Sequence, residues 1–221
     1  MSLLRTVVCL TCMFLVGCGA LIADRKGTVI VYAPNVTVAS NPALPSVSWS
    51  LVVTKPEALP LIDSPRIAVR PVASQLMFYK GVSWAAPGTN LVEHSILDAF
   101  EDSGRIKAVG LTNIGMRSDY KLVLELRHFE SEYTNQTTTP SVRIELSMKL
   151  INSRTQEIIA THVCQVRQPA RSAQVDDVVS AFSQAIGQIS SQVVEWTLIS
   201  GQRDAANKPS IPVFNYSHSP T

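Results

Sequence analysis

Residues 142–150 read VRIELSMKL, the most regular alternation of apolar and polar side chains in the chain. Successive side chains of a β-strand point to opposite faces of a sheet, so Ile144 and Leu146 share one face while Glu145 and Lys149 share the other. One apolar face and one wet face are typical of an antiparallel sheet that is covered on a single side. The stretch therefore predicts a strand whose apolar face packs on a core.

Similar patterns lie on both sides of this strand. Residues 120–127 alternate in the same way, and residues 157–167 follow a turn at 152–156, which is where a hairpin partner is expected. Two further stretches, 48–54 and 66–73, are also β-like. The sequence thus predicts an antiparallel sheet of about four to five strands.

Two stretches carry apolar residues at helical spacing. The first begins at Asn90, with Glu93 placed to complete a reciprocal cap, and ends at a Ser-Gly pair at 103–104. The second runs from about 174 to 200, and its long apolar seam favours a helix packed on the sheet over a coiled-coil partner helix. The predicted fold class is α+β, with two helices packed on one face of the sheet.

The first 17 residues have the features of a secretory signal peptide. Their apolar run, 6–16, is too short to cross a bilayer, which takes roughly 20 residues. Residues 15–18, Leu-Val-Gly-Cys, resemble the lipobox of bacterial lipoproteins. That resemblance implies cleavage before Cys18 and covalent attachment of acyl chains, such as palmitate, to its thiol and its new amino group. An aspartate directly after the lipidated cysteine would resemble an inner-membrane retention signal. This position is Gly19, which favours the outer membrane.

The mature chain divides by composition. Residues 18–47 are rich in Pro, Ser and Thr and predict a tether that follows the lipidated Cys18. Residues 48–200 hold the periodic segments and predict one folded domain. Residues 201–221 are polar and show no period, so a disordered tail is predicted there.

Composition and motifs indicate neither a nucleic-acid-binding protein nor an enzyme. The 221 residues include 19 Lys and Arg against 17 Asp and Glu, and the basic residues are interspersed with acidic ones. The four histidines are far apart, so no metal ligand set is predicted, and no HExxH, GxSxG or phosphate-binding glycine motif occurs. We expect no cofactor other than the lipid on Cys18.

A few residues could support chemistry in isolation. Glu125, Glu130 and Glu132 lie on or just past a strand, where a glycosidase-like pair is formally possible, although lone carboxylates on a strand are usually solvated. Cys164 falls on the apolar face of its strand, which indicates a packed small hydrophobe rather than a nucleophile. We therefore predict no catalytic residue.

Several segments taken in order resemble the ABC-type transport auxiliary lipoprotein family. Residues 82–87 (VSWAAP) lead into a Gly-terminated helix at 91–105, as in that family. Residues 118–122 (SDYKL) resemble its Asp-Tyr-x-Leu strand with a downstream Phe, 142–152 resemble its next strand, and 194–196 (VEW) resemble the end of its last helix.

The resemblance implies a non-enzymatic envelope component. Members accompany transporters built from an ATPase, a permease and MCE-domain (mammalian cell entry) proteins, which move phospholipids or other hydrophobic compounds between membranes. The lipoprotein is expected to stand on the outer membrane, facing the periplasm, with an MCE-domain protein and the associated permease and ATPase as partners. Whether the protein also forms a homo-oligomer is left open by the sequence. The family's recognisable positions, Trp84, Asp119, Tyr120 and Trp196, resemble fold residues rather than site residues.

Two alternatives outside an MCE system remain. One is a lipid-binding lipoprotein whose core opens along the Leu122, Leu146 and Phe182 face to hold an acyl chain. The other is a lipoprotein that assembles envelope machinery.

Overall fold

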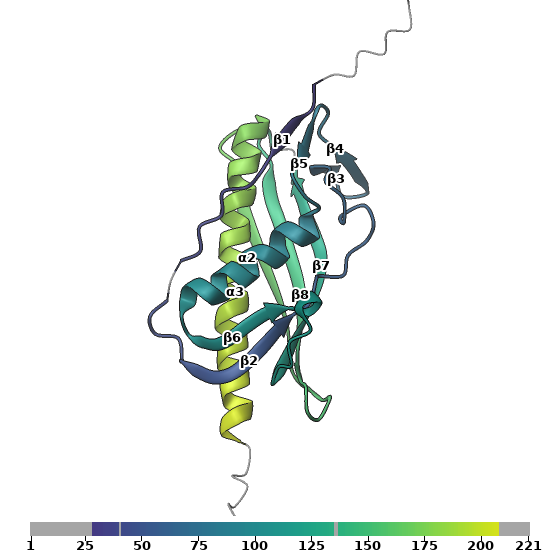
Figure 1. The fold of residues 1–221 in the computed structure, drawn as a ribbon. Helices are drawn as coiled ribbons and strands as arrows, with labels where there is room; N and C mark the ends of the chain where they lie inside the picture. Colours follow the sequence, from purple (N-terminus) through teal and green to yellow (C-terminus); the bar gives the residue numbers. More distant parts are fainter. Residues whose placement is uncertain (1–27, 40, 135–136, 208–221) are drawn as a thin grey trace, which may run out of the picture.

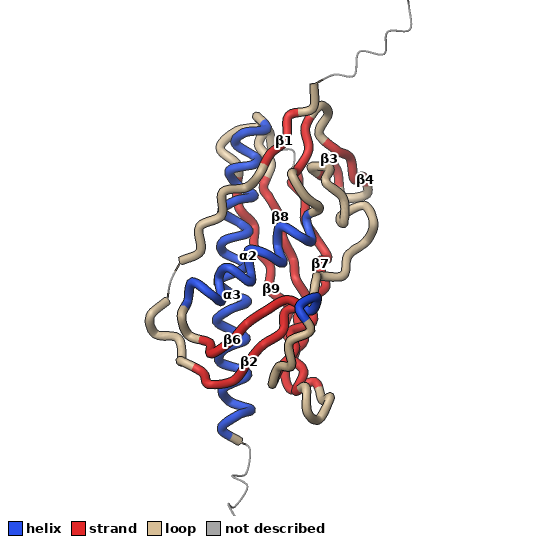
Figure 2. The backbone as a smooth tube through the Cα atoms, in the orientation of Figure 1, coloured by secondary structure: helices blue, strands red, loops and turns tan. Residues whose placement is uncertain are grey.

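The computed structural model describes residues 28–39, 41–134 and 137–207. Two helices lie against one large sheet (Figures 1 and 2). The sheet has seven strands: β2 (Val47–Val53), β3 (Ala68–Val72), β4 (Gln75–Phe78), β6 (Ile106–Leu111), β7 (Tyr120–Glu132), β8 (Ser141–Asn152) and β9 (Ile158–Pro169). The helices are α2 (Gly88–Ser103) and α3 (Val175–Ala206). Two short strands, β1 (Ile30–Tyr32) and β5 (Val82–Trp84), form a separate parallel pair.

The α+β class and its two helices are confirmed, but the sheet is larger than predicted and mixed rather than antiparallel. β7, β8 and β9 form the antiparallel meander that the alternating pattern predicts. β2 and β3 both pair in parallel with the other edge of β7, β2 at its start and β3 at its end. β6 then pairs in parallel with β2 after the crossover through α2, and β4 pairs with β3. A parallel pair needs a long connection, so its partner cannot be inferred from local alternation.

A β-bulge divides β7. Leu126 pairs with Leu146 and His128 pairs with Glu145, so Arg127 is the extra residue. The bulge changes which positions face the core, from even-numbered ones such as Leu126 to odd-numbered ones such as Phe129. Simple alternation does not predict this change.

The core lies between the sheet and the helices. Phe182 of α3 contacts both Phe129 and Trp84, with ring centroids 5.0 Å apart in each case. Ser95 of α2 and Ser190 of α3 share a buried hydrogen bond of 2.9 Å. Gly88, at the start of α2, and Phe182 of α3 both lie against the Phe129 ring, so α2 and α3 pack on the same face of the sheet.

The start of α2 differs from the predicted cap. The helix begins at Gly88 after Pro87, and no side chain caps it. Asn90 already lies in the first turn, where its amide N–H donates to the Pro87 carbonyl oxygen, 3.0 Å away. Glu93 is buried, so the reciprocal cap of Asn90 and Glu93 does not form. The predicted end is confirmed: Gly104 adopts φ 58°, a left-handed conformation that glycine accepts readily.

Neither helix of the described residues combines the length and the apolar character that a membrane span requires. α3 extends to Ala206, beyond the predicted boundary at 200. Gly201 continues the helix because it packs against Trp49; a Cβ there would lie 2.5 Å from Trp49 Cζ2. Residues 201–206 of the predicted tail therefore belong to the folded domain, while 208–221 lie outside the described residues.

Residues 28–39, which we call the N-terminal strap, run along α3 although the sequence predicts a tether there (Figure 1). β1 of the strap pairs with β5, and the Ser191 hydroxyl donates to the Ala39 carbonyl oxygen. The strap passes so close to Gly187 that a Cβ there would lie 2.3 Å from the Thr37 oxygen. The signal peptide, Cys18 and 18–27 lie outside the described residues.

Candidate functional site

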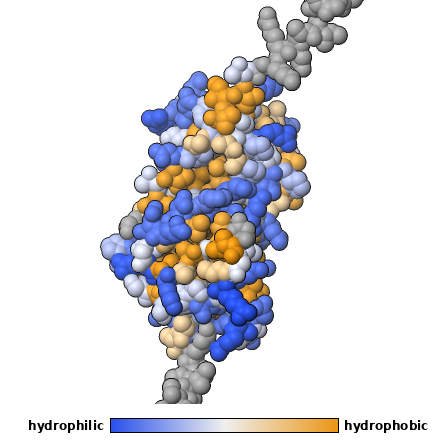
Figure 3. Space-filling model, in the orientation of Figure 1, coloured by the Kyte–Doolittle hydropathy of each residue, from blue (hydrophilic) through white to orange (hydrophobic). Residues whose placement is uncertain are grey.

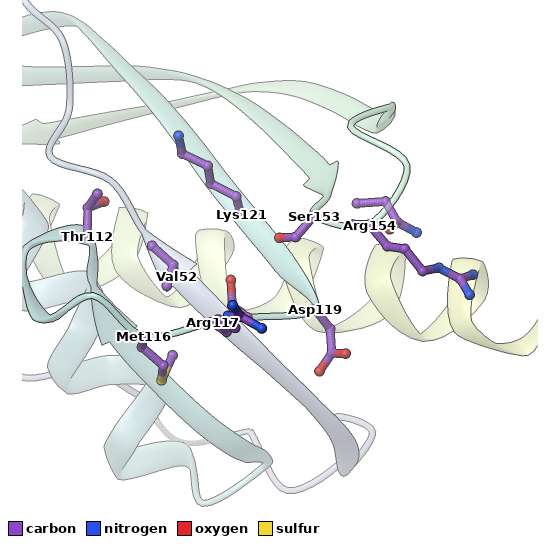
Figure 4. A pocket seen from close by; sticks show the side chains of 10 residues that line it. Val52, Thr112, Met116, Arg117, Asp119, Lys121, Ser153 and Arg154 are labelled. Carbon is purple, nitrogen blue, oxygen red and sulfur yellow. Dashed lines mark hydrogen bonds between the residues drawn. The ribbon is translucent and has the colours of Figure 1, made fainter.

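An open cleft of about 790 Å³ lies where β7 begins and β8 ends (Figure 4). It is formed by β2, the short 3₁₀ helix η1 (Thr112–Ile114) with the segment after it, the first residues of β7 and the β8–β9 turn. Its lining residues are Val52, Thr112, Met116, Arg117, Ser118, Asp119, Lys121, Asn152, Ser153 and Arg154. We call this the basic cleft.

Asp119 holds the wall of the basic cleft in place. Its Oδ2 accepts hydrogen bonds from both the backbone N–H and the hydroxyl of Ser50, each 2.8 Å long. The Asp119 N–H donates back to the Ser50 carbonyl oxygen, 3.1 Å away. This reciprocal contact joins the chain entering β7 to β2, which gives Asp119 a structural role.

The basic residues of the cleft extend to solvent. Arg117, Lys121 and Arg154 are all exposed, and their side chains point in different directions around the opening (Figure 4). Within the described part of the chain, Arg117 and Lys121 make no salt bridge, whereas the Asp119 carboxylate is occupied by Ser50. Exposed cations attract an oppositely charged surface, so the basic cleft is suited to bind an anionic partner.

Tyr120 connects the basic cleft to the end of α3. It is fully buried, and its hydroxyl donates to Asp204 Oδ2 over 2.7 Å. Burial, followed by the hydrogen bond to Asp204, raises the pKa of the Tyr120 phenol well above its usual value. Trp49 packs edge-on against its ring, with centroids 5.0 Å apart. Tyr120 therefore serves packing and stays protonated.

The helix-free face of the sheet carries a second polar cluster at the other end of β7. Glu130 has a side chain only 1% exposed, and Arg70 Nη2 lies 3.0 Å from its Oε1. His128 Nδ1 is 2.7 Å from the same oxygen, and the Phe129 N–H donates to Oε2 over 2.8 Å. Glu132 forms an ion pair with Arg167. These contacts make Glu130 and Glu132 members of a structural ion-pair network.

The contacts of Glu125, Glu130 and Glu132 bear on the glycosidase-like carboxylate pair that is formally possible from the sequence. Glu130 and Glu132 are both buried against arginines, and Glu125 is paired with Arg127 over 3.1 Å. Each of the three carboxylates is therefore engaged by an arginine, as in a structural ion pair. An open depression of about 730 Å³ does adjoin the network, between Arg70, Glu132 and neighbouring residues.

Cys164 packs in the core as predicted. It is 4% exposed, and burial raises the pKa of its thiol to about 11. At neutral pH this thiol is almost entirely protonated, whereas the thiolate is the nucleophile. His162 lies on the same face and stacks on Trp196, with centroids 5.9 Å apart.

The face that could open around an acyl chain is closed in this structure. Leu122, Leu146 and Phe182 are each fully buried within one continuous core. In the described part of the chain, no three or more His, Cys, Asp or Glu side chains converge as a metal site requires.

The sequence did not predict the basic cleft. Arg117 and Lys121 flank the start of β7, whereas Arg154 lies in the later β8–β9 turn. The pairing of Tyr120 with Asn152 brings those segments together. An excess of exposed cations around one strand start is visible only once that register is known.

The fold and its surfaces define an α+β domain with an open polar cleft and a solid core. A model of the ABC-type transport auxiliary lipoprotein component matches residues 31–194. The chain belongs to this family, as its resemblances predict, and the match extends from β1 to most of α3.

Individual proteins resemble this chain to different degrees. A crystal structure of a protein from Xanthomonas campestris is 46% identical, superposes with a TM-score of 0.78, and covers 81% of this chain and 100% of that one. A second solved structure, of an uncharacterised protein, is 14% identical with a TM-score of 0.58; it covers 76% of this chain and 97% of that one and shows the shared fold alone. An uncharacterised protein of Bradyrhizobium diazoefficiens is 24% identical over 159 residues, which are 72% of this chain but 42% of that relative. This chain thus matches less than half of the latter's length.

Proposed function

We propose that this protein is a non-enzymatic accessory subunit of an MCE-type transporter, anchored in the outer membrane through lipid on Cys18 and facing the periplasm. Its partners are an MCE-domain protein and, through it, the permease and ATPase. The cargo is lipid or another hydrophobic compound. Family membership over residues 31–194 is the single observation that carries this proposal.

The shape of the domain supports a docking role. Its core is filled, so cargo has no ready apolar chamber along the Leu122 and Leu146 face. The basic cleft presents the exposed side chains of Arg117, Lys121 and Arg154 to a partner. A subunit that acts by contact needs such a surface rather than a catalytic constellation.

We place the docking contact at the basic cleft. The described chain begins at residue 28 beside β1, near the end of β7, whereas the cleft lies at the start of β7. The 13 residues of β7 span about 43 Å at 3.3 Å per residue. An acidic surface on the MCE-domain protein would complement the exposed Arg117 and Lys121.

Copurification tests both statements. The tagged full chain, solubilised from envelopes of its own cells, is expected to bring down an MCE-domain protein identified by mass spectrometry. Reversing two cleft charges, Arg117→Glu with Lys121→Glu, is expected to reduce that capture about tenfold, which corresponds to about 1.4 kcal/mol.

Lys107→Glu is the matched control, because Lys107 is an exposed lysine on β6 that lines no part of the cleft. Capture of no MCE-domain protein by the unaltered chain would refute the accessory role. Equal capture by the double charge reversal and the control would refute the cleft as the contact while leaving the role standing.

A further inference from the structure

Exposed aliphatic side chains gather at the end of the molecule where the described chain begins. Val29, Ile30 and Val31 are 54%, 55% and 60% exposed, and Val72 and Met77 are about half exposed. Figure 3 shows apolar surface over this region. We call these five residues the apolar end. Single exposed aliphatic residues are ordinary, but three in succession beside two more are typical of a contact surface.

The topology brings these residues to one end. β1 pairs with β5, and the Ile30 N–H donates to the Gly81 oxygen, 2.9 Å away, in the turn that follows β4. β4 pairs with β3, and β3 pairs with β7 at Ser131, near the end of that strand. The apolar end and the basic cleft therefore lie at opposite ends of β7.

Basic side chains accompany the aliphatic ones. The Arg66 guanidinium lies over the Phe78 ring, 3.8 Å from its centroid, and Lys80 follows β4. Both side chains are exposed, and neither makes a salt bridge to any residue that the structure describes. Aliphatic groups bordered by cations suit the interface of a phospholipid bilayer, where phosphate groups lie above the acyl chains.

The length of chain before the described residues indicates which surface lies nearby. Ten positions separate Cys18 from residue 28, and ten residues span at most about 36 Å. If Cys18 carries the lipid, as the proposed function states, residue 28 and the adjoining apolar end cannot leave the vicinity of that membrane. The basic cleft, at the other end of β7, can lie about 43 Å farther from that membrane.

We propose that the apolar end rests on the phospholipid surface in which Cys18 is anchored. The contact orients β7 away from the bilayer and presents the basic cleft to the periplasm. It rests on the proposed lipidation, and it adds an orientation that the anchor by itself does not determine.

Site-specific fluorescence can measure this contact in the lipidated full-length protein. Val31→Cys, at the apolar end, and Ile158→Cys, beside the β8–β9 turn, introduce thiols at exposed aliphatic positions; Ile158 is 54% exposed. A thiol-reactive NBD dye reaches only the introduced cysteine, because Cys164 is buried and Cys18 is acylated. The labelled protein is reconstituted into vesicles of phosphatidylethanolamine and phosphatidylglycerol, with and without quencher-labelled lipids.

We expect NBD at position 31 to show blue-shifted emission and to be quenched by the quencher-labelled lipids. NBD at position 158 should show neither effect. Adding Ile30→Asp and Met77→Asp should abolish the quenching at 31, whereas Ile158→Asp should leave it unchanged. Because the vesicles contain this protein alone and the quencher sits in the lipid, quenching cannot arise from a protein partner.

The outcomes separate the two proposals. Protein that fails to float with the vesicles contradicts lipidation of Cys18 and thus the proposed anchoring. Protein that floats but shows equal, unquenched emission at 31 and 158 overturns the membrane contact and leaves the anchor intact. Circular dichroism of each variant confirms that the fold is retained.

Discussion

The two halves of β7 differ in how their polar side chains lie on the helix-free face of the sheet. From Tyr120 to Leu126 the strand alternates simply, with Lys121 and Glu125 exposed on the helix-free face. From His128 to Glu132 the polar residues on that face are half-buried or buried, and Glu130 and Glu132 are paired with arginines. The bulge at Arg127 separates the halves.

The difference shows that one edge of a single strand can pair with two different strands. β2 contacts the first half and β3 the second, and each contact lasts only two or three residues. The bulge bends β7 between them. It also places Phe129 toward the helices and Glu130 toward Arg70, a change of phase that a regular strand could not provide.

Deleting single residues should distinguish the halves most strongly. Deletion of Val123 forces either Tyr120 and Leu122 or Leu124 and Leu126 out of the core, because one residue fewer reverses every side chain beyond it. Two buried side chains cost roughly 1.5–3 kcal/mol each, so about 3–6 kcal/mol is lost from a typical domain stability of about 5–15 kcal/mol. Deletion of Arg127 removes the bulge residue and keeps the facing of every other residue, so we expect a loss of only about 1 kcal/mol.

Urea unfolding of both deletion variants, followed by circular dichroism, checks this difference. The result would contradict the assigned bulge if loss of Arg127 unfolded the protein as thoroughly as loss of Val123.

Removing one carboxylate from each half should give a smaller contrast. Glu130→Ala leaves Arg70 beside an empty buried site, and breaking a buried ion pair costs about 3 kcal/mol. Glu125→Ala removes a pair whose side chains are 53% and 40% exposed, which should cost about 0.5 kcal/mol or less. Urea midpoints at fixed ionic strength give both values, and equal losses would show that the network at Glu130 is not structural.

A modest loss is expected at the start of the strand. Tyr120→Phe removes the hydroxyl that donates to Asp204 while keeping the packed ring. Asp204 retains a hydrogen bond from Asn152 Nδ2 over 3.3 Å, so the loss should be about 1 kcal/mol. Thermal unfolding against the unaltered protein measures it; a loss as large as that of Glu130→Ala would mean that Asp204 depends on Tyr120 alone.

Local pattern predicted the elements whose partners are local. The meander of β7, β8 and β9 and the seam of α3 follow from alternation and helical spacing, because each element there packs on its sequence neighbour. The family followed from the order of those elements and their motifs. Asp119 and Tyr120, which resemble fold residues of the family, make structural contacts with Ser50 and Asp204.

The failures share a cause as well. The parallel pairs of β2 with β6 and of β3 with β7 join distant segments, and no local alternation encodes them. The sequence predicts a tether at the strap because residues 18–47 are rich in Pro, Ser and Thr, yet Gly187 leaves the space that Thr37 occupies. The basic cleft required the pairing of Tyr120 with Asn152.

The way in which β2 and β3 share one edge of β7 has a consequence for the order of folding. Ser50 and Asp119, which join β2 to β7, are 69 positions apart, whereas β7 and β8 are joined by a short loop. Contacts between distant segments carry a larger loop-closure cost and form late. The meander with α3 should therefore form first and recruit the earlier strands afterwards. In this molecule, the described part of the chain nearest to Cys18 in sequence is expected to fold last.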